Sequence, residues 1–512
     1  MKRIAAAITF VLSASPAWSQ PKPADPYAPA PKPVPAEARP RGPVEPWSPP
    51  PAQPPGTKPA KPGKPADPYA VKPAAEPKAK PVKPVDPYAR VRPGAPSAKA
   101  KPVDPYAAPV PTAPIIPARV GLGDITAVQG LLAVQRLDGW LLFDRDGVNP
   151  IAKRLVAPDG NPSRPWFYLI PARGEPIALV HDAEKRSFEH LAGKKLTYQG
   201  YRELDKQLRV VLKGQRAVAV EYSPKAAVPT VSRVDAGTME MIRAAGVTVK
   251  SSHTLVQYTK AIWGDAGRTA HYLAVHHLVE LRKEALAFVA KQLGASAAVT
   301  EYDVQQRLVR GMTMRGLAGA PPVVAAGINT ADPYYVPSAT KTAPIRRGDL
   351  IVISLAGRAD KPEGIYAAHT WCAVADATVR PEVQKAFETV ALARDQALAL
   401  VGDRTRKGRP LTGSEVDLST RSFIKKAGLA DKVKHRTGHS IDADLQGGGA
   451  DLDDFEVRDT RILLAGTGFT VGPGLYFAGQ FGVRSEVSVF LGANGPEVTT
   501  PAQDDIEVLL AR

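Results

Sequence analysis

The distribution of proline is the feature that most restricts where this chain can fold. Residues 21–120 hold 32 of the 52 prolines and show almost no apolar periodicity. Proline lacks a backbone N–H and fixes φ, so it is excluded from helix interiors and central strands. A segment with so little apolar surface cannot offset the entropy lost on ordering. We therefore expect residues 20–119 to form a disordered, extended, proline-rich linker that precedes the folded part.

This linker carries an imperfect repeat, Asp-Pro-Tyr-Ala. Four copies begin at Asp25, Asp67, Asp86 and Asp104, and each follows Ala or Val. Two interpretations stay open. The repeats are either part of a low-complexity spacer, or a docking array in which each tyrosine is an anchor and repetition adds avidity.

Residues 1–19 have the pattern of a cleaved secretory signal peptide. Lys2 and Arg3 precede an apolar run over residues 4–12, and Ala-Trp-Ser at residues 17–19 places small side chains at the cleavage site. The run is too short to span a bilayer, and no later segment is long and apolar enough to do so. The sole cysteine, Cys372, excludes an intrachain disulfide. We expect an exported protein, located in the periplasm.

Most of the positive charge lies in the linker. Residues 21–120 contain 16 Lys and Arg against 7 Asp and Glu, which supplies +9 of the total +17. An exported basic segment suits an anionic envelope polymer or a protein partner. Nucleic acid is not expected as a partner, because the chain carries an export signal and no recognisable reader motif.

Two folded parts follow the linker. Residues 120–262 alternate strand-like runs, such as GWLLFD and WFYLIPA, with helical runs, such as RELDKQLRVVLKG, which indicates an α/β architecture. Residues 263–512 begin with a long helical stretch near residues 265–293 and then mix strands with helices, which indicates an α+β domain. Thr300 is the expected N-cap of a second helix.

Seven segments in order between residues 130 and 495 carry a family resemblance: NPIAKRL, WFYLIPARGEP, EYSPKAAVPTVSRVDAGT, APIRRGDLIVISL, IYAAHTW, HRTGHSID and FGVRSEVSV. In them the chain resembles the Xaa-Pro aminopeptidase/creatinase family of pita-bread metallopeptidases. The resemblance implies a creatinase-like N-terminal domain over residues 120–262 and a pita-bread domain over residues 263–512. It also implies a cleft in which active relatives hold two divalent ions with five protein ligands, and a homodimer, since relatives often dimerise.

The resemblance implies that this chain keeps two of the five ligands. The histidine and the last glutamate are present as His439 and Glu486. The other three ligand positions, two aspartates and a glutamate in relatives, hold Ser354, Ala368 and Gly472.

Two further histidines that relatives use on the substrate are also replaced, by Tyr334 and Gln446. Two divalent ions bring four positive charges, and Glu486 is the one carboxylate left to oppose them. Burying such ions with so little compensation carries a large desolvation penalty. Ser354 is a weak ligand for these ions. We therefore predict no bound cofactor and no catalysis, and a binding or scaffold role instead.

The alternative is an active exopeptidase or amidohydrolase that acts on Xaa-Pro peptides. It would use a single manganese, cobalt or zinc ion on His369, His439 and Glu486, or no metal at all. His369 follows Ala368 directly, and neighbouring strand residues face opposite sides, so only a bulge would bring His369 into the cleft. We expect it behind the sheet.

The remaining cleft should then be lined by Tyr334, His439, Gln446 and Tyr476, and should hold a peptide end or a small amide. Arg484 and Glu486 share one face of their strand by period two. With no metal present, Glu486 is expected to pair with Arg484 or to hydrogen-bond to His439, in a structural role.

Overall fold

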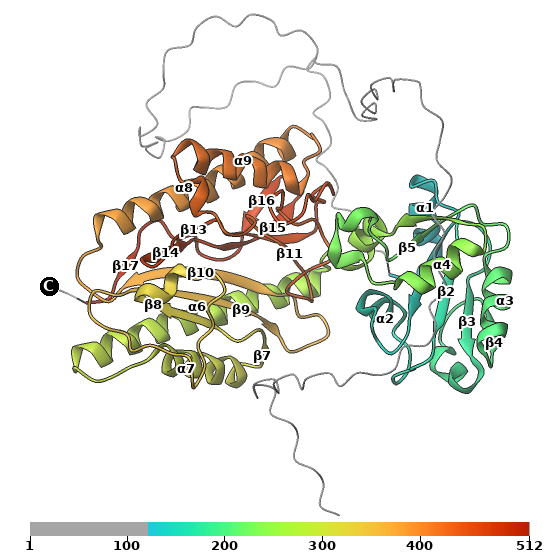
Figure 1. Cartoon of the computed structure of the whole chain (residues 1–512), viewed down its shortest axis with the longest axis horizontal. Coiled ribbons are helices and arrows are strands. Elements are labelled where there is room, and N and C mark those ends of the chain that lie inside the picture. The colour runs from blue at the N-terminus through green and yellow to red at the C-terminus, as the bar shows by residue number, and fades with distance from the viewer. Residues whose placement is uncertain (1–120, 511–512) are drawn as a thin grey trace, which may run out of the picture. The chain divides into compact units, whose positions relative to one another are not determined.

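The computed structural model describes residues 121–510 (Figure 1). The predicted signal peptide, residues 1–19, and the predicted linker, residues 20–119 with its four repeats, lie outside the described residues. Among residues 121–510, no helix combines the length and the apolarity that a membrane crossing requires.

A six-stranded sheet with strand order β4-β3-β2-β1-β5-β6 forms the first part of the described chain. Strand β1 pairs antiparallel with β2 and parallel with β5. Its side chains alternate between two apolar layers: Trp140 packs with helices α1 and α2, and Leu141 with α3 and α4. The α/β layering predicted from the sequence is therefore present. The bounds are α1 Ile125–Val134, β1 Gly139–Asp144, α2 Pro150–Val156, β2 Trp166–Pro171, β3 Ile177–His181, β4 Lys194–Tyr198, α3 Tyr201–Val211, β5 Ala217–Val220, α4 Ala236–Ala244, β6 Thr248–Ser251 and α5 His253–Val256.

The second part is built around the antiparallel pair β9 and β10. The 30-residue helix α6 and helix α7 cover one face of this pair, where Ile353 and Leu355 of β9 are buried. Helix α8 packs toward the opposite face, against Cys372 of β10. The two faces thus carry alternate residues of each strand. The bounds are α6 Asp265–Gly294, α7 Glu301–Met314, β7 Leu317–Ala318, β8 Val323–Ala326, β9 Leu350–Ala359, β10 Ala367–Val374, α8 Pro381–Arg406 and α9 Gly413–Lys426.

A further sheet of order β11-β12-β15-β16 and the hairpin β13-β14 complete this part. Strand β12 pairs with β15, and β13 with β14, so the Pro-Gly turn after residue 472 leads from one sheet into the hairpin. Thr300 caps α7 in a reciprocal capping box with Asp303, as predicted. The bounds are β11 Ser440–Ile441, β12 Gly468–Val471, β13 Gly474–Phe477, β14 Phe481–Arg484, β15 Val487–Gly492, β16 Gly495–Val498 and β17 Glu507–Val508.

Candidate functional site

Three of the residues at or beside the inherited ligand positions meet at the centre of the second part. Ser354 of β9 lies directly opposite Thr370 of β10 in the sheet register, and Thr370 forms a bridge to Glu486. The Thr370 hydroxyl is 3.0 Å from the Ser354 hydroxyl and 2.8 Å from a Glu486 carboxylate oxygen. Serine and threonine hydroxyls therefore surround the single retained carboxylate.

Glu486 is already neutralised by a protein cation. Nη2 of Arg484 donates to its carboxylate at 2.6 Å, and the Glu486 and Arg484 side chains are 3 % and 24 % exposed. Burial alone would raise the pKa of Glu486, but the charge of Arg484, aided by His439 and by the Thr370 hydroxyl, lowers it below its usual range. The predicted ion pair is therefore present, although the two residues do not share a strand: Arg484 ends β14, and Glu486 lies just before β15.

Gly472 and Glu486 compete for the same space. A Cβ built on Gly472 would lie 2.8 Å from both Cβ and Cγ of Glu486 and 3.2 Å from its carboxyl carbon. Such distances are shorter than non-bonded carbon atoms tolerate. Glu486 thus occupies the space that the first side-chain carbon at position 472 would need. The glycine at position 472, where the resemblance predicts a glutamate in relatives, therefore leaves room for the Glu486 side chain.

His439 is the second residue that the family resemblance predicts to be a retained ligand. Its Nδ1 is 3.1 Å from the carbonyl oxygen of Ser440, so Nδ1–H donates there and Nε2 is free of the proton. Burial lowers the pKa of His439, and the nearby Glu486 opposes the shift. No hydrogen bond joins His439 to Glu486 in the described part of the chain. Within residues 121–510, no three His, Cys, Asp or Glu side chains gather closely enough to hold a metal ion.

His369 lies on the α6 side of β10, as the alternation of strand side chains requires. It is 1 % exposed, and neither ring nitrogen has a hydrogen-bond partner. Burial, reinforced by the charge of Arg282 on α6, lowers its pKa to about 3. His369 shares no cavity with Ser354, which faces the other side of the sheet. The donors present therefore do not fit two divalent ions.

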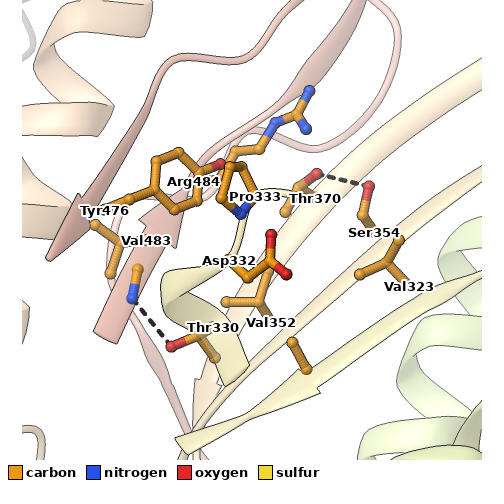
Figure 2. A pocket seen from close by; sticks show the side chains of 12 residues that line it. Val323, Thr330, Asp332, Pro333, Val352, Ser354, Thr370, Tyr476, Val483 and Arg484 are labelled. Carbon is orange, nitrogen blue, oxygen red and sulfur yellow. Dashed lines mark hydrogen bonds between the residues drawn. The ribbon is translucent and has the colours of Figure 1, made fainter. Parts of the chain in front are cut away.

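A small cavity of about 50 Å³ adjoins these residues (Figure 2). Strands β8, β9, β10, β13 and β14, the 3-10 helix Gly327–Ala331 and the residues that follow it contribute to its wall. Its lining residues are Val323, Ala325, Thr330, Asp332, Pro333, Val352, Ser354, Thr370, Tyr476, Gly482, Val483 and Arg484.

The structure does not gather the four residues expected to line one cleft. Tyr476 lines the cavity, but Tyr334 is 71 % exposed and His439 is not part of the wall. Gln446 accepts a hydrogen bond from Arg436 at 2.7 Å and lines a separate cavity. The expectation of one cleft with all four is therefore corrected, because the Arg436 contact holds Gln446 elsewhere.

Asp332 is a cavity residue that the sequence interpretation missed. Its Oδ1 accepts the backbone N–H of Tyr334 at 2.9 Å, which closes a local Asp-Pro turn. The segment Ala331-Asp332-Pro333-Tyr334 repeats the Ala-Asp-Pro-Tyr found twice in the linker, at residues 24–27 and 66–69. The recurrence of this tetrapeptide is the sequence signal that could have drawn attention to Asp332.

Comparison with known proteins identifies relatives. Residues 268–493 match metallopeptidase family M24. The Xaa-Pro dipeptidase of Lactobacillus delbrueckii subsp. lactis is 27 % identical over 242 residues, covering 45 % of this chain and 60 % of that protein. The Xaa-Pro dipeptidase of Pyrococcus furiosus is 25 % identical over 184 residues, covering 36 % and 48 %. The chain spans only about half the length of the first curated relatives that it matches, 52 % and 48 %.

Solved structures resemble a larger share of the chain. Dipeptidase PepE from Mycobacterium ulcerans aligns with a TM-score of 0.59 at 21 % identity, over 75 % of this chain and 96 % of that one. The prolidase from Thermococcus sibiricus aligns with a TM-score of 0.55 at 20 % identity, over 75 % and 98 %. At these identities the likeness concerns the fold, and it confirms the predicted pita-bread class.

Proposed function

Because the chain belongs to the pita-bread Xaa-Pro peptidase family, we propose that it is a non-catalytic member that acts by binding. One observation carries the proposal: the carboxylate of Glu486, the last of the inherited acidic ligands, is bound by Arg484 at 2.6 Å. An ion placed there would have to displace a guanidinium and face its positive charge. The family relatives act as dipeptidases, and this chain keeps their fold without their set of metal donors.

Electrostatics supports this proposal independently of the number of ligands. At an effective dielectric constant of about 20, a divalent ion about 4 Å from a guanidinium meets a repulsion of roughly 8 kcal/mol. A lone imidazole from His439 offers no compensating charge. A single-ion site would need a third donor, and His369 faces the other side of the sheet. The single-ion hydrolase is therefore the weaker candidate.

The first test measures metal content and turnover in the mature protein. After dialysis against manganese, cobalt or zinc, we expect substoichiometric metal by mass spectrometry of the elements and no cleavage of Xaa-Pro dipeptides. A stoichiometric ion, with turnover abolished by His439→Ala, would overturn the proposal. An active relative such as a prolidase, assayed beside it, shows that the substrates and ions are competent.

The second test restores the inherited ligands. A variant with Ser354→Asp, Ala368→Asp and Gly472→Glu, combined with Tyr334→His and Gln446→His, should take up metal where the native chain does not. The matched control carries Gly472→Glu alone and should take up none, because it adds one carboxylate and also crowds the existing one. Equal uptake by the native chain and the restored variant would show that the emptied positions do not disable the site.

We place the protein outside the cytoplasm, tethered by its basic proline-rich linker to an anionic envelope polymer or to a protein. The composition of residues 1–120 supports this part of the proposal. Mass spectrometry of the protein from a periplasmic extract should find an N-terminus at Gln20. An intact Met1 in all fractions would contradict export through cleavage.

A further inference from the structure

The repeat in the predicted linker extends beyond Asp-Pro-Tyr-Ala. In all four copies the sequence is Lys-Pro, then Ala or Val, then Asp-Pro-Tyr-Ala, and the copies begin at Lys22, Lys64, Lys83 and Lys101. Each copy carries one lysine and one aspartate, so the copies are neutral and the charge of +9 in residues 21–120 lies outside them. A spacer needs extension but no fixed order of side chains. The recurrence of this order therefore favours a docking role for the repeats.

One copy of the central tripeptide lies in the described part of the chain and shows which local structure it forms there. At Asp332-Pro333-Tyr334, Oδ1 of Asp332 accepts the backbone N–H of Tyr334 at 2.9 Å, and Tyr334 is 71 % exposed. This turn needs only the aspartate and the two residues after it, so its formation does not depend on the surrounding fold. A ligand that forms such a turn before binding loses less entropy when it docks.

A cavity of about 240 Å³ in the second folded part has the size of a tyrosine side chain. It lies where helix α8 ends, and Gly408, with a φ of +58°, turns the chain there into Arg409 and Pro410. Ile462 lines the cavity and is 44 % exposed, so its apolar surface is open to water. About eight water molecules would occupy this volume, and a tyrosine side chain has eight non-hydrogen atoms. The buried apolar residues of the wall pack together in one cluster: Val401, Leu411, Leu463 and Leu491.

Polar groups at this cavity suit the hydroxyl and the carboxylate of the repeat. The Thr405 hydroxyl donates to the carbonyl oxygen of Val401 at 2.8 Å, so its lone pairs remain for a phenolic proton. Arg409 lines the cavity, is exposed, and forms no ion pair or side-chain hydrogen bond within residues 121–510. Arg406, on the wall of the adjoining cavity, is likewise without an ion pair in that part of the chain. The two arginines attract the aspartate of a repeat and repel the basic segments between the repeats.

We propose that this cavity binds the tyrosine of a Lys-Pro-Ala/Val-Asp-Pro-Tyr-Ala repeat of the same chain, with the aspartate of the repeat beside Arg409. The last repeat ends at Ala107, 14 residues before Gly121, and an extended chain of that length spans up to about 50 Å. The earlier copies reach further. A ligand on the same chain is present at an effective concentration in the millimolar range, so a weak contact suffices. The proposal goes beyond the proposed function and holds whether or not the protein is catalytic.

The experiment uses the mature full-length protein with Ile462 replaced by the photo-crosslinking residue p-benzoylphenylalanine. After irradiation and digestion, mass spectrometry identifies the peptides that are joined to residue 462. We expect peptides that contain a repeat tyrosine, in a fractional yield that stays the same on tenfold dilution, because ligand and cavity belong to one chain. The matched control carries the crosslinker at Leu392 of α8, which is 51 % exposed and outside this cavity, and should give at least tenfold less of these peptides.

Variants of the repeats identify the side chains that dock. Replacing the tyrosines at residues 27, 69, 88 and 106 together by alanine should lower the yield at least tenfold, because the aromatic surface is lost. Replacing them by phenylalanine is the matched control and should keep most of the yield, since only the bond to Thr405 is lost. Arg409→Ala should lower the yield about two- to fivefold, as expected for an exposed ion pair.

A measurement without the crosslinker guards against a disturbance of the cavity by the new side chain. Backbone hydrogen exchange of residues 462–465 should be faster in the four-alanine variant than in the native chain, because the docked repeat no longer covers them. The proposal is overturned if repeat peptides are absent at residue 462 and hydrogen exchange is unchanged, or if the Leu392 control yields as many of them. It is also overturned if the yield falls in proportion to dilution, or if the four-alanine variant crosslinks as the native chain does.

Discussion

The ion pair between Glu486 and Arg484 allows a direct test of whether Glu486 serves as a metal ligand or as the counter-ion of Arg484. A carboxylate kept for metal binding can be replaced in the metal-free protein with little loss of stability. A carboxylate that neutralises a buried guanidinium cannot, because its removal leaves the cation uncompensated. Glu486→Gln keeps the size of the side chain and its bond to Thr370 while removing the charge.

The geometry of the ion pair sets the loss of unfolding free energy expected for Glu486→Gln. The N···O distance is 2.6 Å and the Glu486 side chain is 3 % exposed. Charges whose centres lie about 4 Å apart interact by roughly 4 kcal/mol at an effective dielectric constant of 20, and breaking buried pairs from one side costs about 3–5 kcal/mol. The folded pKa of Glu486 lies below its unfolded value of 4.5, so this stabilisation is fully present above pH 4.5 and disappears as pH falls through the folded value.

The assay is urea unfolding at pH 7 in the presence of a chelator, followed by tryptophan fluorescence. Glu497→Gln is the matched control: its pair with Arg268 has the same 2.6 Å distance, but its side chains are 42 % and 45 % exposed. For Glu497→Gln we expect the free energy of unfolding to fall by less than about 1 kcal/mol. The double variant Glu486→Gln with Arg484→Met should lose less free energy of unfolding than Glu486→Gln alone. If Glu486→Gln is as stable as the native protein without metal, the counter-ion role is wrong.

Three other perturbations test neighbouring features. Burial raises the pKa of Glu221 to about 7, and Nε1 of Trp140 donates to it at 2.7 Å, so Trp140 fluorescence should titrate near pH 7 and Glu221→Gln should abolish the titration. The pKa of Glu221 is raised on folding, so its contribution to stability is present below pH 4.5 and is lost as pH rises through 7. His369 stays neutral when folded to about pH 3, whereas the unfolded chain takes up its proton near pH 6.5. His369 should therefore contribute a fall in stability of about 1.4 kcal/mol per pH unit below pH 6.5, and His369→Leu should reduce the slope of the free energy of unfolding against pH by that amount in denaturant titrations. Gly472→Ala should cost about 1–3 kcal/mol in the same unfolding assay, because its Cβ would lie 2.8 Å from carbon atoms of Glu486; an unchanged stability would mean that Glu486 moves aside freely.

Elements with strong apolar patterns were predictable from the sequence, whereas polar edge strands were not. The run GWLLFD indicated β1, which is buried throughout. Strands β4 and β6, with the sequences KKLTY and TVKS, gave no such signal and lie at the two edges of the six-stranded sheet. Edge strands often carry lysine, which discourages pairing with other chains. Their identity as strands depends on the neighbour that they pair with, which a local pattern does not contain.

The candidate site shows the same division. The assignment of emptied ligand positions rests on matching motifs and stays a prediction, whereas the orientation of His369 follows from the alternation of side chains along a strand. Gly472 directly follows β12 and Glu486 directly precedes β15, so their overlap is revealed only by the pairing of these two strands across the β13–β14 hairpin. Asp332 is an intermediate case, since the recurrence of Ala-Asp-Pro-Tyr is visible in the sequence but its position on a cavity wall is not.

The replacements at this site compensate one another. If the predicted ligand assignment holds, a centre that lost three acidic ligands at random would keep an unpaired buried carboxylate, which is energetically costly. Here Arg484 neutralises Glu486, the glycine at position 472 leaves room for it, and Thr370 supplies a hydroxyl proton. Because every one of these contacts would have to be broken to seat a divalent ion, adding metal ions alone should not restore a centre.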